Sequence, residues 1–427
     1  MQRSWLLTVL AAGSVVAGAC ASGGTGGGAS AAPSGGAATG GASKGEIIIA
    51  SDLPVSGADA SDGIPTQNGV QFAVESTGTL KGFKLTWKGF DDTVNGAHDP
   101  QKGAQNVQQM LNDNKILGMV GPFNSNVAAA EIPVGNRGSL AMVSPSNTND
   151  CLTKPDFGGK PCTDPNPKNL RPAGGNNYFR IAAADSFQGP AMADYAYDTL
   201  KLTKVAVWSD NEIFGKGVAD TFQAEFIKKG GQVVVRQDFD TKVTNDWKPF
   251  LTDAKSKGAM GVYAGATSGT KACIPRAQMA GIIDGPYMTP DGGVNSQCIK
   301  DAGSNAASMY GTVAGANAEQ NPDAKATVDA FKAKFTKKDD LGSYTFMAYD
   351  CAKIIIDAIG RAIDANGGNM PSRQQVVTAL GQTKNLKLTT GTYTFDANGD
   401  PTTPTMSIFQ TKSGDWAFIK QFGVGGS

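Results

Sequence analysis

Residues 115–134 have the sequence KILGMVGPFNSNVAAAEIPV, and this stretch decides the fold class. The run from Ile116 to Val120 is short and apolar throughout, which is typical of a strand buried on both faces of a parallel sheet. A polar loop follows at 121–126, and a helical pattern begins at Val127. A buried strand that leads directly into a helix predicts an α/β fold with right-handed crossovers.

The same alternation continues on both sides of this stretch. Further strands are predicted at 47–50, 84–87, 141–143, 205–208, 233–235 and 261–264, with helices at 67–76, 101–112, 217–229 and 346–365. The carboxy-terminal part differs, because strand-like segments at 392–395, 406–410 and 416–419 alternate with Asn-Gly and Ser-Gly turns. Residues 46–427 exceed the roughly 250 to 300 residues at which one core usually divides, so we expect two lobes.

Composition excludes several classes of function. The 38 basic and 38 acidic residues balance, so no basic excess indicates nucleic acid or an anionic membrane surface. The only histidine, His98, lies between Gly-Ala and Asp-Pro, and we predict that it is a surface loop residue. We therefore predict no catalysis, no cofactor and no metal. A secreted hydrolase is the enzyme alternative, but the only G-x-S-x-G match, at 41–45, has no strand before it.

The amino-terminal segment resembles a bacterial lipoprotein signal. Arg3 precedes an apolar stretch that is too short to span a bilayer, and Ala17-Gly18-Ala19-Cys20 ends in a cysteine, although Ala17 stands where such signals usually have leucine. We predict a signal peptide over 1–19 and lipidation of Cys20, the alternative being an ordinary secretory peptide. Residues 20–45, rich in Gly, Ala and Ser, are predicted to be a flexible linker that anchors an extracytoplasmic protein to the outer face of the membrane.

Export favours disulfides among the remaining five cysteines. Cys151 and Cys162 bracket a loop rich in Pro and Gly, and Cys273 and Cys298 begin successive helical regions, so these are the predicted pairs. Cys351 then remains free. It shares a predicted helical face with Ile355 and Ala358, which favours a buried thiol.

Polar residues follow three of the predicted strands. Ser125 follows the strand at 116–120, Ser146 and Thr148 follow the strand at 141–143, and Asp291 follows Tyr287-Met288. Ligands bind at the carboxyl ends of parallel strands, where hydroxyls and backbone N–H groups at a helix N-terminus suit a carboxylate, and an aspartate suits an ammonium group. Each residue also has a structural alternative, as a helix cap or a turn residue.

These segments resemble the type I periplasmic binding proteins, and among them the Leu/Ile/Val-binding group that serves ABC transporters. The similar segments follow the family's order over residues 46–420: Ile47 to Gly57, Asn68 to Glu75, Asp91-Asp92, Val120 to Ser125, Val143 to Thr148, Phe179-Arg180, Asp185 to Pro190, Phe214 to Gly217, Pro290 to Gly292, Ala348 to Asp350, Phe395-Asp396 and Gly399-Asp400. The resemblance implies two Rossmann-like lobes with parallel sheets, joined by three hinge crossovers.

The resemblance also implies lobe boundaries and site residues. Lobe 1 would comprise 46–184 and 314–390, and lobe 2 would comprise 185–313 and 391–427, with crossovers near 184, near 312 and between 388 and 405. Ser125, Ser146 and Thr148 match residues that bind the α-carboxylate and α-ammonium groups of an amino acid. Asp291 matches an acidic residue, usually Glu, that faces the ammonium from the second lobe.

Two positions depart from the family pattern. Asp62 stands where the family often has an aromatic residue over the ligand, and Thr267 stands where it often has a tyrosine. Both changes make the side-chain end of the site more polar, which disfavours a branched aliphatic ligand. Asp62 has the alternative of pointing to solvent, which we favour slightly. Tyr344 and Phe346 could still provide an apolar wall.

The sequence thus predicts an extracytoplasmic lipoprotein that captures an amino acid, or a related small polar or amide-like solute, between two lobes. The partners implied are the membrane subunits of an ABC importer and the membrane that holds the lipid, with no nucleic acid. Two alternatives stay open: the ligand-binding component of a sensor, and a surface lipoprotein without a transport role.

Overall fold

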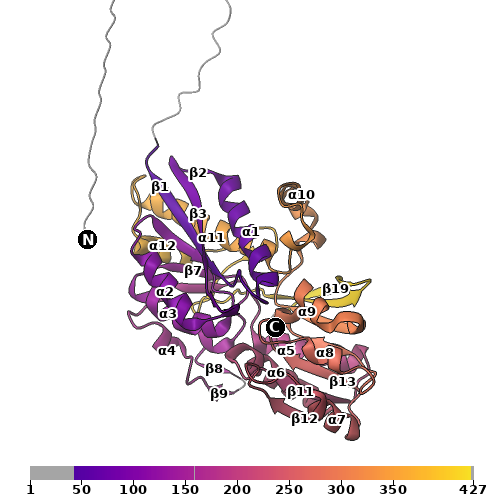
Figure 1. Cartoon of the computed structure of the whole chain (residues 1–427). Coiled ribbons are helices and arrows are strands. Elements are labelled where there is room, and N and C mark those ends of the chain that lie inside the picture. The colour runs from indigo at the N-terminus through magenta and orange to yellow at the C-terminus, as the bar shows by residue number, and fades with distance from the viewer. Residues whose placement is uncertain (1–42, 158, 425–427) are drawn as a thin grey trace, which may run out of the picture. The chain divides into compact units, whose positions relative to one another are not determined.

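The computed structural model describes residues 43–157 and 159–424, and a six-stranded sheet lies in the centre of the first lobe (Figure 1). Its strand order is β10-β7-β6-β1-β3-β2, and all neighbours are parallel except β2 and β3. The strands are β1 (Glu46–Leu53), β2 (Thr79–Leu80), β3 (Phe83–Asp91), β6 (Ile116–Val120), β7 (Ala141–Ser144) and β10 (Tyr178–Arg180).

Helices cover both faces of this sheet because alternate residues of its strands are apolar on both sides. Ile47 and Ile49 of β1 pack with α1 (Ala60–Thr77), α11 (Thr345–Ala365) and α12 (Arg373–Gly381). Ala50 packs on the other face, with α2 (Pro100–Leu111) and α3 (Ser125–Arg137). Figure 1 shows α11 and α12, from late in the chain, beside this early sheet. The first lobe is therefore assembled from two separate chain segments.

A seven-stranded sheet forms the second lobe, in the order β12-β11-β13-β14-β15-β18-β19. Five strands are parallel, and the hairpin β18–β19 completes the sheet in antiparallel fashion. Ser413 and Gly414 form the hairpin turn, both with positive φ. The strands are β11 (Lys204–Ser209), β12 (Gln232–Asp238), β13 (Gly261–Gly265), β14 (Tyr287–Thr289), β15 (Met309–Val313), β18 (Thr405–Lys412) and β19 (Asp415–Gly423).

The helices of the second lobe also lie on both faces of their sheet. Val205 and Val207 of β11 pack with α5 (Asp185–Asp194) and α6 (Ile213–Lys228). Ala206 and Trp208 of the same strand pack on the opposite face, where α7 (Lys248–Ser256), α8 (Ile274–Gln278) and α9 (Ser296–Ala302) lie. These two sheets confirm the predicted α/β fold of two Rossmann-like lobes. None of the helices within the described ranges combines the length and the apolar character needed to cross a bilayer.

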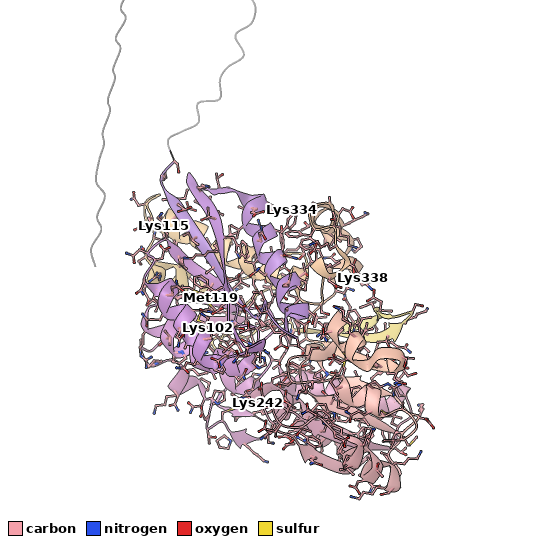
Figure 2. The ribbon with its side chains drawn as sticks, viewed as in Figure 1. Lys102, Lys115, Met119, Lys242, Lys334 and Lys338 are labelled. Atoms are coloured by element: carbon pink, nitrogen blue, oxygen red, sulfur yellow. A yellow bond between two sulfur atoms is a disulfide. The ribbon has the colours of Figure 1, made fainter. Side chains whose placement is uncertain are left out.

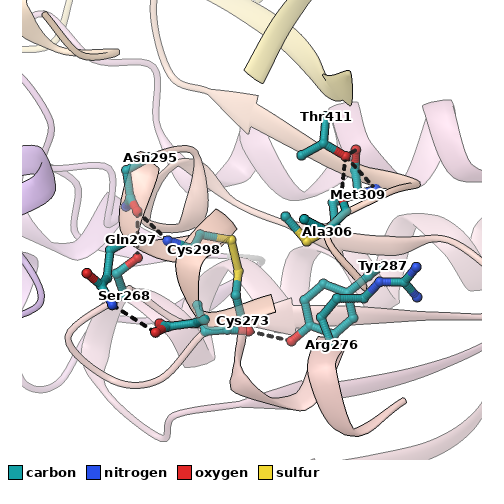
Figure 3. Close-up of a disulfide and its surroundings, with 12 residues drawn as sticks. Ser268, Cys273, Arg276, Tyr287, Asn295, Gln297, Cys298, Ala306, Met309 and Thr411 are labelled. Carbon is teal, nitrogen blue, oxygen red and sulfur yellow. Dashed lines mark hydrogen bonds between the residues drawn. A yellow bond between two sulfur atoms is a disulfide. The ribbon is translucent and has the colours of Figure 1, made fainter. Parts of the chain in front are cut away.

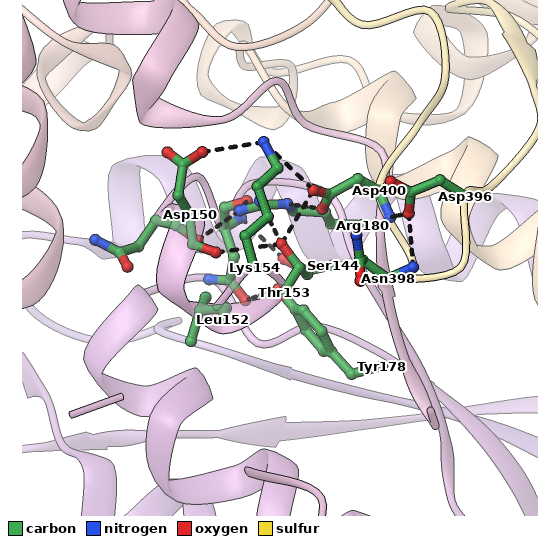
Figure 4. Close-up of polar contacts among 12 residues, drawn as sticks. Ser144, Asp150, Leu152, Thr153, Lys154, Tyr178, Arg180, Asp396, Asn398 and Asp400 are labelled. Carbon is green, nitrogen blue, oxygen red and sulfur yellow. Dashed lines mark hydrogen bonds and ion pairs between the residues drawn. The ribbon is translucent and has the colours of Figure 1, made fainter. Parts of the chain in front are cut away.

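The chain passes between the two sheets three times: after β10, after β15 and before β18. Near the last passage, Asp400 accepts a hydrogen bond from Arg180 Nε at 2.7 Å (Figure 4). Phe395 packs on Phe179 with ring centroids 5.0 Å apart. Residues 395–400 thus contact the first sheet. These contacts agree with a third crossover between 388 and 405, and they place Phe395 and Asp400 against the first sheet. The lobe boundaries stay predictions.

Smaller corrections concern element ends. Helix α1 begins at Ala60, seven residues before its predicted start, despite Pro65 inside it. Strand β17 (Thr392–Tyr393) pairs with β16 (Leu386–Lys387) and stops before Phe395. The amide of Lys44 donates to Gly82 O at 2.9 Å, so contacts with the first lobe begin inside the predicted linker. Between the lobes, Lys338, labelled in Figure 2, pairs with Asp415 of β19 at 2.9 Å.

Both predicted disulfides are present in the structure. Cys151–Cys162 lies within the first lobe, and Cys273–Cys298 joins the start of α8 to α9 in the second (Figure 3). Cys351 is a free cysteine buried in α11. Burial raises the pKa of its thiol well above the usual value, so the group is neutral and unreactive.

Candidate functional site

The predicted site residues lie on loops that leave the carboxyl ends of four parallel strands. Ser125 follows β6, Ser146 follows β7, Thr267 follows β13, and Asp291 follows β14. The carboxyl ends of neighbouring parallel strands meet at one edge of a sheet, so each lobe brings its two loops together. In this structure the edges of the two sheets face each other across a small cavity.

Four of the six predicted ligand-binding residues line this cavity. Ser125 and Ser146 line it from the first lobe, and Thr267 and Asp291 line it from the second. Phe123, Asn124, Phe214 and Gly292 complete the lining. Thr148 and Asp62 are buried but are not among the residues that line it.

The first lobe presents hydroxyl groups beside the start of α3. Ser125 is the first residue of this helix, after Asn124 at the N-cap, so the early backbone N–H groups lie beside the cavity. Ser146 Oγ donates to Phe123 O at 3.0 Å, and Asn147 Nδ2 donates to the same oxygen at 2.6 Å. The Thr148 hydroxyl has no hydrogen-bond partner within the described residues. This side of the cavity can hold a carboxylate.

The second lobe presents a carboxylate. Asp291 is buried, accepts a hydrogen bond from the Tyr344 hydroxyl, and accepts another from the Gly292 amide at 3.0 Å. Burial raises the pKa of Asp291 to about 6, and the Tyr344 hydrogen bond opposes this shift. The donors around Asp291 are neutral, so a ligand ammonium would supply the opposite charge that the protein does not place there.

Asp62 is also buried, which corrects the slightly favoured expectation that it points to solvent. Asn295 Nδ2 of the second lobe donates to Asp62 Oδ2 at 2.6 Å, and Ser268 donates to Asn295 at 2.9 Å. Burial raises the pKa of Asp62 well above its ordinary value, and the charges of Asp59 and Asp291 add to the shift. Asp62 therefore lies at the contact between the lobes rather than on the surface.

His98 lies at the same contact, so its predicted surface position is wrong. Its ring is buried, Nδ1 lies 2.6 Å from Asp59 Oδ2, and Nε2 lies 2.9 Å from Glu212 Oε2 of the second lobe. Burial alone would lower the pKa of His98, but these two carboxylates raise it well above 6.5. Asp59 also accepts from the Gly269 amide at 2.6 Å, which makes a second contact between the lobes. The partner residues are distant in sequence, so no local pattern could reveal this network.

Three further polar side chains beside Asp291 were missed as site residues. Asp185, Gln188 and Tyr263 are fully buried, and their side-chain oxygens and the Gln188 amide nitrogen have no hydrogen-bond partner within the described residues. Burial raises the pKa of Asp185 well above its ordinary value, with the charge of Asp150 as the next cause. Asp185 and Gln188 belong to a segment that the family resemblance had already marked, and the absence of hydrogen-bond partners is visible only in three dimensions.

Comparison with solved structures supports the same fold. The leucine-binding protein LivK of Thermotoga maritima superposes with a TM-score of 0.73 at 23% sequence identity, covering 88% of this chain and 99% of that one. LivJ of Streptococcus pneumoniae, solved in complex with isoleucine, gives a TM-score of 0.73 at 23% identity over 89% of this chain and 99% of its own. A solute-binding protein of R. palustris in complex with benzoate gives 0.69 at 18% identity, over 88% of this chain and 96% of that one.

Comparison of sequences identifies the family. "Leu/Ile/Val-binding protein homolog 3" of Brucella melitensis is 30% identical over 372 residues, which cover 86% of this chain and 92% of the relative. The Leu/Ile/Val-binding protein BraC3 of Rhizobium johnstonii is 26% identical over the same shares of the two chains. A model of the periplasmic binding protein family matches residues 46–415. The sheets, crossovers and site loops follow the order expected for this family. The chain belongs to the periplasmic binding proteins.

Proposed function

We propose that this protein captures an amino acid, or a related small polar solute, between its lobes and delivers it to an ABC importer outside the cytoplasm. One observation carries the proposal: the cavity between the lobes has hydroxyls and a helix N-terminus on one side and the buried carboxylate of Asp291 on the other. These two sides of the cavity suit the carboxylate and the ammonium group of a zwitterion. The named relatives, which are Leu/Ile/Val-binding proteins, support an amino acid as the class of ligand.

The two ends of the ligand would meet different chemistry. Ser125, Ser146 and the first N–H groups of α3 would hold the carboxylate, and Thr148 would contribute its unpartnered hydroxyl after a small adjustment. Asp291, oriented by Tyr344, would hold the ammonium group. Because the two groups belong to different lobes, a ligand that bridges them would stabilise the closed arrangement over an open one.

The side-chain end of the ligand would meet polar residues. Thr267 lines the cavity near Thr270, whose hydroxyl accepts a hydrogen bond from the Thr267 amide at 2.9 Å. Asp62 does not line the cavity, but it lies buried beside Asn295 and close enough to Asp291 for the two charges to interact. Among the described residues the Asn295 amide is the hydrogen-bond donor to this buried carboxylate, which favours a ligand with a cationic or hydrogen-bond-donating side chain. We therefore expect leucine to bind more weakly than such an amino acid.

A thermal-shift screen tests the proposed function. The purified protein is heated with single amino acids, amides, urea and small carboxylates, because a ligand that binds only the folded state raises the melting temperature. We expect zwitterionic amino acids with polar or cationic side chains to give the largest shifts. A screen in which only simple carboxylates or urea raise the melting temperature would contradict the ammonium contact at Asp291.

The membrane anchor is a separate part of the proposal, since Cys20 lies outside the described residues. We expect Cys20 to be the acylated first residue of the mature chain, joined to the first lobe by residues 21–43. Intact-mass measurement of protein extracted from membranes decides this. Cys20→Ala should release the protein from the membrane and leave its ligand affinity unchanged, whereas a mature chain that starts elsewhere would refute the anchor.

A further inference from the structure

Three buried carboxylates meet beneath the ligand-binding loops of the first lobe. Asp52 comes from β1, Asp92 follows β3, and Glu131 lies on α3, and the exposed fraction of each is 0%. One oxygen from each residue lies within 4.8 Å of the other two. We call these residues the carboxylate triad. Its members come from three different elements and do not contribute to the proposed ligand contacts.

The protein supplies almost no partners for the triad. Asn106 Nδ2 donates to Asp52 Oδ1 at 3.0 Å and to Asp91 O at 2.8 Å, which fixes the orientation of Asp52. The other five carboxylate oxygens accept no hydrogen bond within the described residues, although Asp52 and Glu131 lie close enough to hydrogen-bond to each other when one of them is protonated. Within the same ranges, no lysine, arginine or histidine forms an ion pair with any member. Buried carboxylates without a partner are strongly unfavourable, so the triad needs an occupant.

The neighbouring helix leaves space for these side chains. Gly103 of α2 faces Glu131, and a Cβ atom at Gly103 would lie 2.4 Å from Glu131 Oε1. Any larger residue at this position would clash with the Glu131 carboxylate and displace it. The glycine in α2 therefore leaves room for the Glu131 carboxylate on the side of the sheet where the triad lies.

We propose that the carboxylate triad binds a hard divalent cation, either Ca²⁺ or Mg²⁺. All the side-chain donors are oxygens, which these ions prefer over nitrogen and sulfur. Two oxygens bound to one Ca²⁺ lie at most about 5 Å apart, since each bond is about 2.3 to 2.6 Å long, and the triad, with oxygens within 4.8 Å of one another, meets this limit. Mg²⁺, with bonds of about 2.0 to 2.1 Å, limits the separation to about 4.2 Å and would require the side chains to move closer together. A bound cation would supply the positive charge that the described residues do not place beside the triad.

The position of the triad gives such a cation a structural role. β1 leads into the loop that carries Asp59, α3 begins at Ser125, and the hairpin after Asp92 carries His98. A cation bound by Asp52, Asp92 and Glu131 would join these three elements below the ligand site. The competing occupant is the proton: burial raises the pKa of Asp52 to about 7, and that of Glu131 well above its ordinary value.

Metal analysis and titration on the whole protein distinguish the two occupants. The protein is purified without chelator, its metal content is measured by mass spectrometry, and chelator-treated protein is then titrated calorimetrically with CaCl₂ or MgCl₂ alone. We expect one binding site per chain and a melting temperature that rises by several degrees with the bound cation. No stoichiometric metal, no heat and no shift with either ion would overturn the proposal in favour of a protonated triad.

Variants show where the cation binds. Glu131→Gln and Asp92→Asn keep the side-chain shape but remove a charged ligand, and we expect each to weaken cation affinity at least tenfold. Asp350→Asn is the matched control, because Asp350 is a buried carboxylate that accepts hydrogen bonds from Thr389 and Thr390, away from the triad. It should keep the parent affinity for the cation. Parent-like cation affinity in the two triad variants would also overturn the assignment, and two variants guard against one that does not fold.

Discussion

Two sets of carboxylates at the contact between the lobes differ in what satisfies them. Asp59 accepts from the His98 ring and from the Gly269 amide, and although burial opposes it, these contacts lower the pKa of Asp59 below its ordinary value. Within the part of the chain that the structure describes, Asp291 and Asp62 accept hydrogen bonds from neutral groups, and burial raises their pKa values. The charge of Asp59 is balanced by His98 without a ligand. Asp291 and Asp62 would be stabilised by a cationic group of a ligand. The difference distinguishes a contact between the lobes that protein groups satisfy from two buried carboxylates that we expect to select the ligand.

The largest expected effect comes from Asp291. Asp291→Asn keeps the shape of the side chain and a group that can hydrogen-bond to Tyr344, but it removes the charge opposite the ligand ammonium. Losing one partner of a buried charge pair commonly costs about 2 to 5 kcal/mol, so amino-acid binding should weaken by roughly 30-fold to several thousand-fold. Titration calorimetry measures the loss. Asp350→Asn serves as control, and parent-like affinity in Asp291→Asn would show that no ammonium binds there.

The contribution of the His98–Asp59–Glu212 contact to stability should depend on pH. His98 faces Asp59 and Glu212 directly, and the charges of Asp92 and Asp210 also act on it. Because the folded-state pKa of His98 is raised above 6.5, its contribution to stability is full below pH 6.5 and is lost as the pH rises through the folded pKa. The Asp59 contribution is lost at the acid end, as the pH falls through its lowered pKa.

His98→Gln measures this contribution. We expect the variant to lose about 3 to 5 kcal/mol of unfolding free energy at pH 6, because it breaks a buried charge pair. The difference from the parent should shrink as the pH rises through the His98 pKa. Denaturant unfolding at several pH values checks this. A difference that stays constant across the alkaline range would show that His98 is neutral in the folded protein.

Asp62 should affect selectivity more than overall affinity. Asp62→Asn keeps an oxygen that can accept from Asn295 but removes the charge, and a hydrogen bond to a charged group is worth about 1.5 to 3 kcal/mol. We expect affinity for a cationic or polar amino acid to fall about 10- to 150-fold while affinity for leucine stays the same or rises. Competition binding with both ligands measures the ratio. Equal losses for the two ligands would place Asp62 outside the ligand contacts.

The smallest effect is expected for Ser125→Ala. The backbone N–H groups of α3 remain after the hydroxyl is removed, so binding should weaken by only about 0.5 to 1.5 kcal/mol. Calorimetry under the conditions used for Asp291→Asn allows a direct comparison. A loss as large as that of Asp291→Asn would mean that the Ser125 hydroxyl, rather than the helix N-terminus, carries the carboxylate contact.

The sequence predicted the fold better than the site. The strand at Ile116–Val120 matches β6 because a buried parallel strand has a continuous apolar run, and the loops that follow such strands meet by topology. The start of α1 was missed because Gly63 and Pro65 disfavour a helix locally, while its contacts with α11 stabilise it. His98 was misplaced because Asp59 and Glu212 are distant in sequence. The carboxylate triad was missed because its members come from three separate elements.

The order of the cysteines along the chain has a consequence for oxidation during secretion. Both disulfides join cysteines that are neighbours in the cysteine sequence, Cys151 with Cys162 and Cys273 with Cys298. An oxidase that acts on cysteines as they emerge would form both native pairs without later exchange. This holds only if Cys20 takes no part, because a free Cys20 thiol would shift every pairing by one. A lipid on Cys20 would thus keep this thiol from competing with the two native disulfides, in addition to anchoring the protein.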